Sequence, residues 1–122
     1  MRAKRLRFLV FRGYKGMYEI ACIDAGTAGH GKTLFAAVQC LAENVQAGIE
    51  MTEGTDLEFL CKARDFETEV FDAIKQGRPV PRAALKATGY SGQLIGIGEL
   101  ALVSKPKPHV DIGHLELERI GA

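Results

Sequence analysis

The sequence predicts a single α+β domain in which strands come first, two helices follow, and strands return at the end of the chain. Three observations predict this order. Two apolar runs flank a glycine-bearing turn near the start, two stretches with helical spacing follow, and two aliphatic runs of strand length close the chain. The length of 122 residues suits one domain, and no repeat or linker divides it.

The stretch "RLRFLVFRGYKGMYEIACID" predicts a β-hairpin. Leu6, Phe8 and Val10 fall on one face of its first run, while Gly13 and Gly16 supply the conformational freedom that a tight turn needs. A short strand is expected between this hairpin and the first helix. Six cations precede the first acidic residue, and we interpret them as solvated charges on an edge strand, with phosphate contacts as the alternative. They are Arg2, Lys4, Arg5, Arg7, Arg12 and Lys15.

Two amphipathic helices are expected in the middle of the chain. The first begins near Thr33, a suitable N-cap, and its apolar stripe is Leu34, Ala37, Val38, Leu41, Val45 and Ile49. The second opens at the capping-box pattern Thr55-x-x-Glu58 and stops before Gly77 and Pro79. Its stripe is Phe59, Ala63, Phe66, Val70, Ala73 and Ile74. Residues 78–92 predict a loop, with room for a short strand or one helical turn.

The runs "QLIGIGELALV" and "HVDIGHLELERI" predict two C-terminal strands, joined by the proline-containing "SKPKP". If no bulge interrupts the second run, Val110, Ile112 and His114 share one face and Leu115, Leu117 and Arg119 share the other. Both faces would then carry apolar side chains, which one small layer could hardly cover. The sequence therefore predicts a homo-oligomer, most simply a C₂ dimer, with residues 93–120 in its interface.

The stretch "GTAGHGKT" matches the G-x-x-x-x-G-K-[ST] phosphate-binding pattern. It predicts, as an alternative function, nucleotide or phosphate binding through Gly26, Gly31, Lys32 and Thr33. Its surroundings argue against that function. The run ahead of it contains Glu19 and belongs to a hairpin, whereas a phosphate loop follows a buried parallel strand, and no further strand–helix alternation follows to build a parallel sheet.

A different protein class accounts for the same residues. The runs "FLVFRGYKGMYEIACID", "GHGKT" and "LFAAVQCLAENVQAGIE" make residues 6–49 resemble the HicB-like antitoxin family. The resemblance implies a partial ribonuclease-H-like layer without its catalytic acids. In that layer Gly31 makes a turn, Thr33 caps a helix and Lys32 is solvated. It further implies a non-enzymatic module that binds another protein and neutralises a small toxin-like partner.

The remaining features point to no further chemistry. His109, Asp111 and His114 form a candidate metal set only if a bulge brings His114 to the face of the other two, so we interpret them as ordinary strand residues. We interpret His30 as a tolerated turn residue.

The three cysteines are odd in number and widely spaced, which favours a reducing, cytoplasmic location; they are Cys22, Cys40 and Cys61. The net charge of +1 argues against a nucleic-acid partner, and the short apolar runs argue against a membrane. We therefore predict no catalytic residue, cofactor or metal site.

Overall fold

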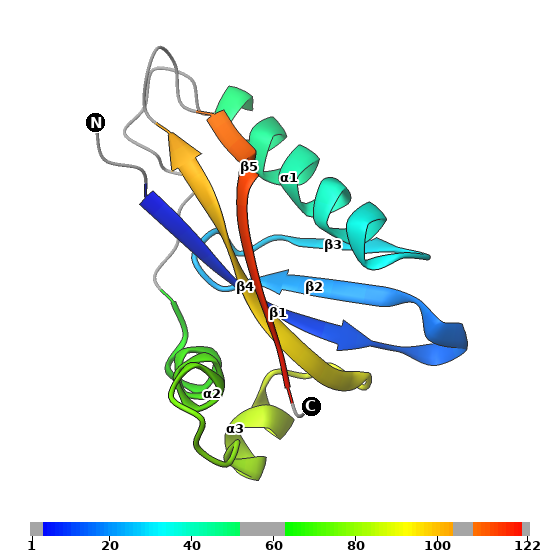
Figure 1. Ribbon diagram of the computed structural model, residues 1–122, viewed down its shortest axis with the longest axis vertical. Coiled ribbons are helices and arrows are strands. Elements are labelled where there is room, and N and C mark those ends of the chain that lie inside the picture. Colours follow the sequence, from blue (N-terminus) through cyan, green and yellow to red (C-terminus); the bar gives the residue numbers. More distant parts are fainter. Residues whose placement is uncertain (1–3, 52–62, 104–108, 121–122) are drawn as a thin grey trace.

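The described residues fold as one antiparallel sheet with three α-helices, in the order strands, helices, strands (Figure 1). The computed structural model describes residues 4–51, 63–103 and 109–120. Within these residues the sheet has five strands in the order β3-β2-β1-β4-β5, and every neighbouring pair is antiparallel. The predicted α+β class and the order of its elements are confirmed.

The predicted hairpin is formed by β1 (Lys4–Arg12) and β2 (Tyr18–Cys22), and a short β3 (Ala28–Gly31) follows it. The strand β1 nevertheless lies at the centre of the sheet, because it pairs with β2 on one side and with β4 (Gln93–Val103) on the other. The interpretation of the basic N-terminal run as an edge strand is therefore wrong. The edges of the sheet are β3 and β5 (His109–Arg119).

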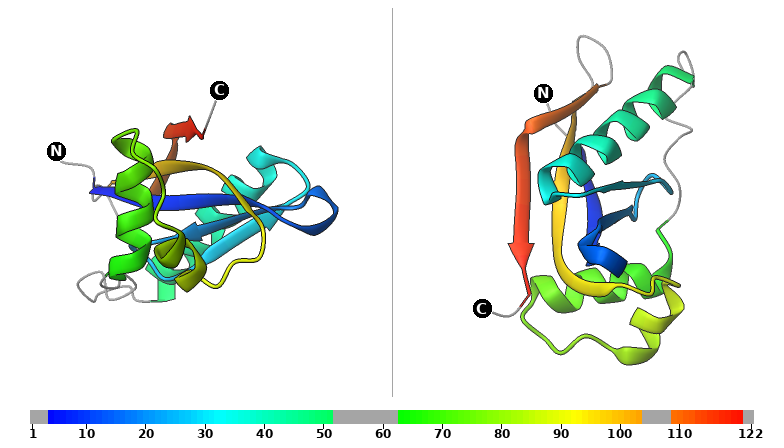
Figure 2. Two further views of the ribbon diagram at one scale, coloured as in Figure 1. Left: turned by 90° about the horizontal axis from the view of Figure 1, so that it is seen from below. Right: turned by 90° about the vertical axis from the view of Figure 1, so that its right-hand side faces the viewer.

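Helices cover both faces of the sheet (Figure 2). The helix α1 (Leu34–Met51) packs on one face, here called the α1 face. The helices α2 (Asp65–Lys75) and α3 (Arg82–Ala87) pack on the other, here called the α2 face. Alternation along β1 separates the two cores: Leu6, Phe8 and Val10 point to the α1 face, whereas Leu9 and Phe11 point to the α2 face.

The start of α1 follows from one side chain. The Thr33 hydroxyl accepts a hydrogen bond from the Ala36 N–H at 3.0 Å, which satisfies one of the unpaired donors of the first turn. Most of the predicted apolar stripe is buried: Ala37, Val38, Leu41, Val45 and Ile49, with Leu34 partly buried. The predicted cap and stripe of the first helix are confirmed.

The second predicted helix begins later than expected. Ala63 and Arg64 are not helical, and α2 starts at Asp65, so a continuous helix running from Thr55 to Ile74 is wrong. The Thr55–Glu58 capping box lies outside the described residues. The helix does stop at Gly77, whose φ of 69° is accessible to glycine, and the Arg78 N–H donates to the Ala73 carbonyl at 2.7 Å to close the end. A third helix, α3, occupies part of the segment predicted as a loop.

A bulge interrupts β5. Glu99 lies opposite Glu116, but Ala101 lies opposite Asp111, so β5 advances five residues while β4 advances two. Because of the three extra residues, Val110 and Leu115 both pack against the core of the α1 face. The unbroken alternation that placed them on opposite faces is therefore wrong. The predicted homo-oligomer loses that argument and stays a prediction, which light scattering at micromolar concentration would test.

Candidate functional site

The stretch Gly26–Thr33 forms a turn, an edge strand and a helix cap. Gly26 has a φ of 59° in the turn after β2. The next residues form β3, which pairs antiparallel with β2 from Ala21 opposite Ala28 to Tyr18 opposite Gly31. A phosphate loop instead wraps successive backbone N–H groups around an anion at the end of a parallel strand. The backbone between Ala28 and Gly31 lies in an extended ladder.

The glycines of this stretch let a helix approach the strand closely. A Cβ atom on Gly31 would lie 2.7 Å from the backbone nitrogen of Ala37. A Cβ atom on Gly29 would lie 2.4 Å from the nitrogen of Leu41 and 2.6 Å from the Ala37 carbonyl oxygen. Real side chains do not tolerate such contacts with backbone atoms. Both glycines are thus required by the packing of α1 on β3, and Gly29, at a variable position of the phosphate-loop pattern, escaped the sequence reasoning.

The four residues of the nucleotide-binding alternative do not converge on one hollow. Only Gly26 borders the hollow described below, and it lies on the α2 face, away from α1. Gly31 packs against α1, Lys32 is exposed, and the Thr33 hydroxyl accepts the capping hydrogen bond. The arrangement explains the glycines and the threonine of the pattern by packing and capping.

We expect Thr33→Ala to lower the free energy of unfolding by about 1 kcal/mol, because the Ala36 N–H loses its acceptor. Lys32→Ala should leave stability nearly unchanged, since an exposed lysine side chain contributes little. Urea unfolding measures both effects. Calorimetric titration with Mg²⁺ and ATP or GTP supplies the functional arm: saturable binding that Lys32→Ala abolishes would contradict the capping interpretation and restore the nucleotide alternative.

A hollow of about 480 Å³ lies between the end of β2, the start of β3 and the start of α2. Glu67 lies in its wall, and its side chain is only 5% exposed. Arg64 neutralises it by donating from Nε to Oε1 at 2.9 Å and from Nη2 to Oε2 at 3.0 Å. Tyr90 closes another side and stacks on Phe11, with ring centroids 4.6 Å apart. The two charged side chains in the wall of the hollow therefore neutralise each other.

The Tyr90 phenol gives this hollow a pH dependence. Burial raises the pKa of Tyr90 above its ordinary value, and Glu67 and Glu19 add to the rise. Because the phenol ionises more readily in the unfolded chain, its contribution to stability is complete below pH 10 and is lost as pH rises from about 10 through the folded pKa. We expect Tyr90→Phe to keep the stack on Phe11 and to lose less stability than the wild type between pH 9 and 11. Urea unfolding across that range measures it, and identical slopes for the two proteins would contradict the assignment.

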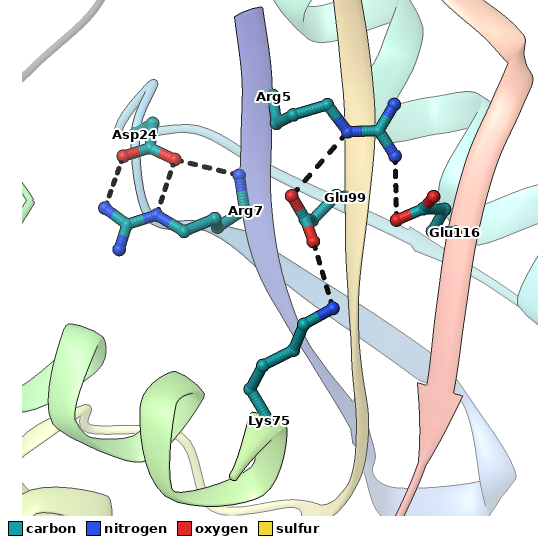
Figure 3. A network of polar contacts seen from close by, with 6 residues as sticks. All are labelled: Arg5, Arg7, Asp24, Lys75, Glu99 and Glu116. Carbon is teal, nitrogen blue, oxygen red and sulfur yellow. Dashed lines mark hydrogen bonds and ion pairs between the residues drawn. The ribbon is translucent and has the colours of Figure 1, made fainter.

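A network of ion pairs runs along the α2 face around Arg5 and Arg7 of β1 (Figure 3). Arg7 donates from Nε and Nη2 to the Asp24 carboxylate at 3.0 and 2.7 Å, and the Arg7 backbone N–H donates to the same carboxylate at 2.8 Å. The hydrogen bond to Asp24 is the main reason that the pKa of Arg7 is raised, although burial opposes it. The basic run that was expected to be solvated is thus held partly by acids from distant segments.

The network continues toward β5. Arg5 contacts Glu99 on β4 at 3.6 Å and Glu116 on β5 at 3.0 Å, and Lys75 of α2 contacts Glu99 at 3.5 Å. These contacts join three strands and one helix through residues between 24 and 111 positions apart in the chain. Sequence reasoning missed them, since no local pattern links Arg5 to Glu116.

The outer end of β5 is exposed. All residues from Glu116 to Ile120, here called the β5 edge, are exposed, and among them Leu117 is 45% and Ile120 is 36% exposed. The other exposed large apolar side chains among the described residues are both on α1: Phe35 at 65% and Met51 at 87%. Large exposed apolar side chains at a sheet edge are typical of surfaces that bind proteins.

The histidine and cysteine predictions have mixed outcomes. The bulge needed to bring His109, Asp111 and His114 together does occur, but the side chain of His114 is not described. Among the described residues, no group of three His, Cys, Asp or Glu side chains could hold a metal ion.

His30 lies exposed in β3 rather than in a turn. Cys22 is buried and Cys40 partly buried, and neither forms a disulfide within the described part of the chain, while Cys61 lies outside the described residues.

Comparisons with known proteins give no match: no protein-family profile, no curated protein sequence and no solved structure matches the chain. In the described part of the chain, no helix has the length and apolar character needed to span a bilayer.

Proposed function

We propose that the protein is a non-enzymatic, HicB-like module that works by binding another protein and neutralises a small toxin-like partner. The observation that supports this proposal is the unit formed by the β1–β2 hairpin, β3 and the Thr33-capped helix α1. The helix packs directly on β3 at Gly29 and Gly31. The order of hairpin, short strand and capped helix is the one that the HicB-like resemblance implies. We assign this unit as a partial ribonuclease-H-like layer.

The acids of the sheet support a non-enzymatic role. Two acidic side chains of the α2 face, Asp24 and Glu99, are held by cations: Asp24 by Arg7, and Glu99 by Arg5 and Lys75 (Figure 3). Glu67 is held by Arg64. Carboxylates that are fixed in ion pairs stabilise the fold and are poorly placed to activate a water molecule. Cys22 and Cys40, which form no disulfide among the described residues, suit the proposed cytoplasmic location.

The proposal is tested by measuring partner binding and nucleotide hydrolysis in parallel. The intact protein would be co-expressed with the protein encoded by the neighbouring gene and then purified. We expect the two to co-purify, to bind with a defined stoichiometry in calorimetry, and to restore growth when the partner alone is toxic. Lys32→Ala serves as a control that should bind equally well. Absence of any partner, together with robust hydrolysis of a nucleotide by the chain alone, would contradict the proposal.

A further inference from the structure

We propose that the β5 edge is where an extended segment of a partner protein adds as a further strand, and that this segment alternates basic with apolar residues. The inference rests on the proposed protein-binding function and names its surface and the chemistry of the partner. It comes from three features of residues 116–120: a free row of backbone groups, two different faces, and an acidic hollow beside them.

The backbone of the β5 edge offers hydrogen bonds outward. Among the described residues, β5 ends the sheet and pairs only with β4. The Ile120 N–H donates inward to the Ile95 carbonyl at 3.0 Å. Because inward and outward groups alternate along an antiparallel strand, the N–H groups of Leu117 and Arg119 point away from β4. An extended segment can therefore pair with them as another strand.

The two faces of the β5 edge differ in character. Leu117 lies opposite Gly98, whose missing Cβ would point at the Phe8 ring, so Leu117 belongs to the α1 face. Glu118 lies opposite Ile97, which packs in the core of the α2 face, and Glu116 lies two residues away on the same side. From Glu116 to Glu118 the edge is therefore apolar on the α1 face and acidic on the α2 face, while Arg119 follows Leu117 on the α1 face. A strand that pairs with residues 116–118 needs apolar and basic residues in alternation.

A hollow of about 290 Å³ on the α2 face offers space for a cation beside the acidic side chains of the β5 edge. Phe71 and Ile97 supply apolar wall, and three carboxylates border it against one ammonium group. The carboxylates are Glu99, Glu116 and Glu118, and the ammonium group is that of Lys75. Arg5 and Lys75 already pair with Glu99, and Arg5 also pairs with Glu116, so Glu118 is the carboxylate left for a further cation. Glu118 makes no ion pair with any residue that the structure describes. A lysine or arginine of the partner would lay its aliphatic stem on the apolar wall and bring its charge to Glu118.

A second copy of this chain fits the β5 edge poorly. Two copies related by a twofold axis pair antiparallel, and residues directly opposite must share a face. Centring the pair on Glu116 or on Glu118 sets that glutamate against itself. Centring it on Leu117 sets Glu116 against Glu118 twice, and centring it on Arg119 sets two arginines together. Like charges directly opposite destabilise a sheet, so every such register favours a partner of opposite charge over self-pairing.

The test uses three blocked nine-residue peptides of defined sequence with the intact protein. One alternates lysine and valine, one alternates glutamate and valine, and one contains the lysines and valines in two blocks. We expect the alternating lysine peptide to bind at least ten-fold more tightly than the others in fluorescence anisotropy, and to protect the amides of Leu117 and Arg119 from exchange. Glu118→Lys should weaken it about ten-fold, whereas the matched variant Glu43→Lys on α1 should not.

A backbone variant separates strand addition from charge attraction. Arg119→Pro removes an outward N–H while leaving the ladder with β4 intact, so circular dichroism should be unchanged and peptide binding lost. Equal binding of all three peptides, or full binding by Arg119→Pro, would overturn the inference. So would a doubled mass in light scattering that Arg119→Pro abolishes, because a second copy would then be the occupant. A natural partner that binds Arg119→Pro normally would overturn the inference alone and leave the proposed function standing.

Discussion

Gly29→Ala is expected to lower the free energy of unfolding by about 3 kcal/mol or more, because the new methyl group would collide with the backbone of α1. The added carbon would lie 2.4 Å from the Leu41 nitrogen and 2.6 Å from the Ala37 carbonyl oxygen. Neither atom can rotate away as a flexible side chain would. The helix must either move off β3 as a body or bend, and both responses open the core that Leu41 and Ala37 help to form.

Thermal and urea unfolding would measure the effect. For a domain of this size each kcal/mol corresponds to roughly 3–5 °C, so Gly29→Ala should melt roughly 10–15 °C below the wild type. The matched control is Gly13→Ala, where the nearest atoms to the added carbon are the Glu19 carboxylate at 3.4 Å and the Met17 carbonyl at 3.7 Å. That variant should stay within about 0.5 kcal/mol of the wild type. Equal, small effects at both positions would show that α1 does not sit on β3 as closely as described.

Local chemistry explains what the sequence predicted well. Thr33 begins α1, Gly77 ends α2, and the run from Gln93 to Val103 forms β4 over its whole length. A helix cap, a residue with positive φ and an apolar run each determine the structure of only the few residues around them. These features can therefore be predicted without knowing the rest of the fold. Such local features also account for the phosphate-loop match, because Gly31 and Thr33 satisfy it while serving packing and capping.

Pairing between distant segments explains what the sequence could not predict. The six N-terminal cations indicated an edge strand, yet β1 lies at the centre of the sheet, since β4, some 90 residues later, pairs with its free side. Arg5 contacts Glu99 only after that pairing is formed, and Arg7 contacts Asp24 where the pairing of β1 with β2 ends. The bulge in β5 is likewise set by its register on β4. It moves Leu115 to the α1 face and leaves the acids of the β5 edge on the other, which no count along the chain indicates.

Asp24→Ala should have the second largest effect, about 2–3 kcal/mol, because one carboxylate satisfies both the side chain and the backbone of Arg7 (Figure 3). The regular ladder between β1 and β2 ends at Phe8 opposite Cys22. Beyond that point the Asp24 carboxylate takes the Arg7 N–H at 2.8 Å, while the Arg7 carbonyl accepts from the Ile23 N–H. Alanine would leave a central-strand N–H and a guanidinium without this acceptor. Because the Arg7 side chain is 27% exposed, water limits the cost to less than that of breaking a fully buried pair.

Two further variants separate the charge from the backbone hydrogen bond. Asp24→Asn keeps an oxygen that can accept from the Arg7 N–H but loses the charge, so it should cost about 1 kcal/mol. Arg7→Met keeps an aliphatic side chain near Phe71, over which the guanidinium lies at 5.8 Å, and removes the ion pair. In a double-mutant cycle measured by urea unfolding, Arg7→Met and Asp24→Ala should couple by about 1–2 kcal/mol. The double variant should still be less stable than Arg7→Met alone, since the backbone N–H of residue 7 remains unsatisfied. Strict additivity, or an Asp24→Ala cost below about 0.5 kcal/mol, would mean that Asp24 does not extend the ladder of the central strand.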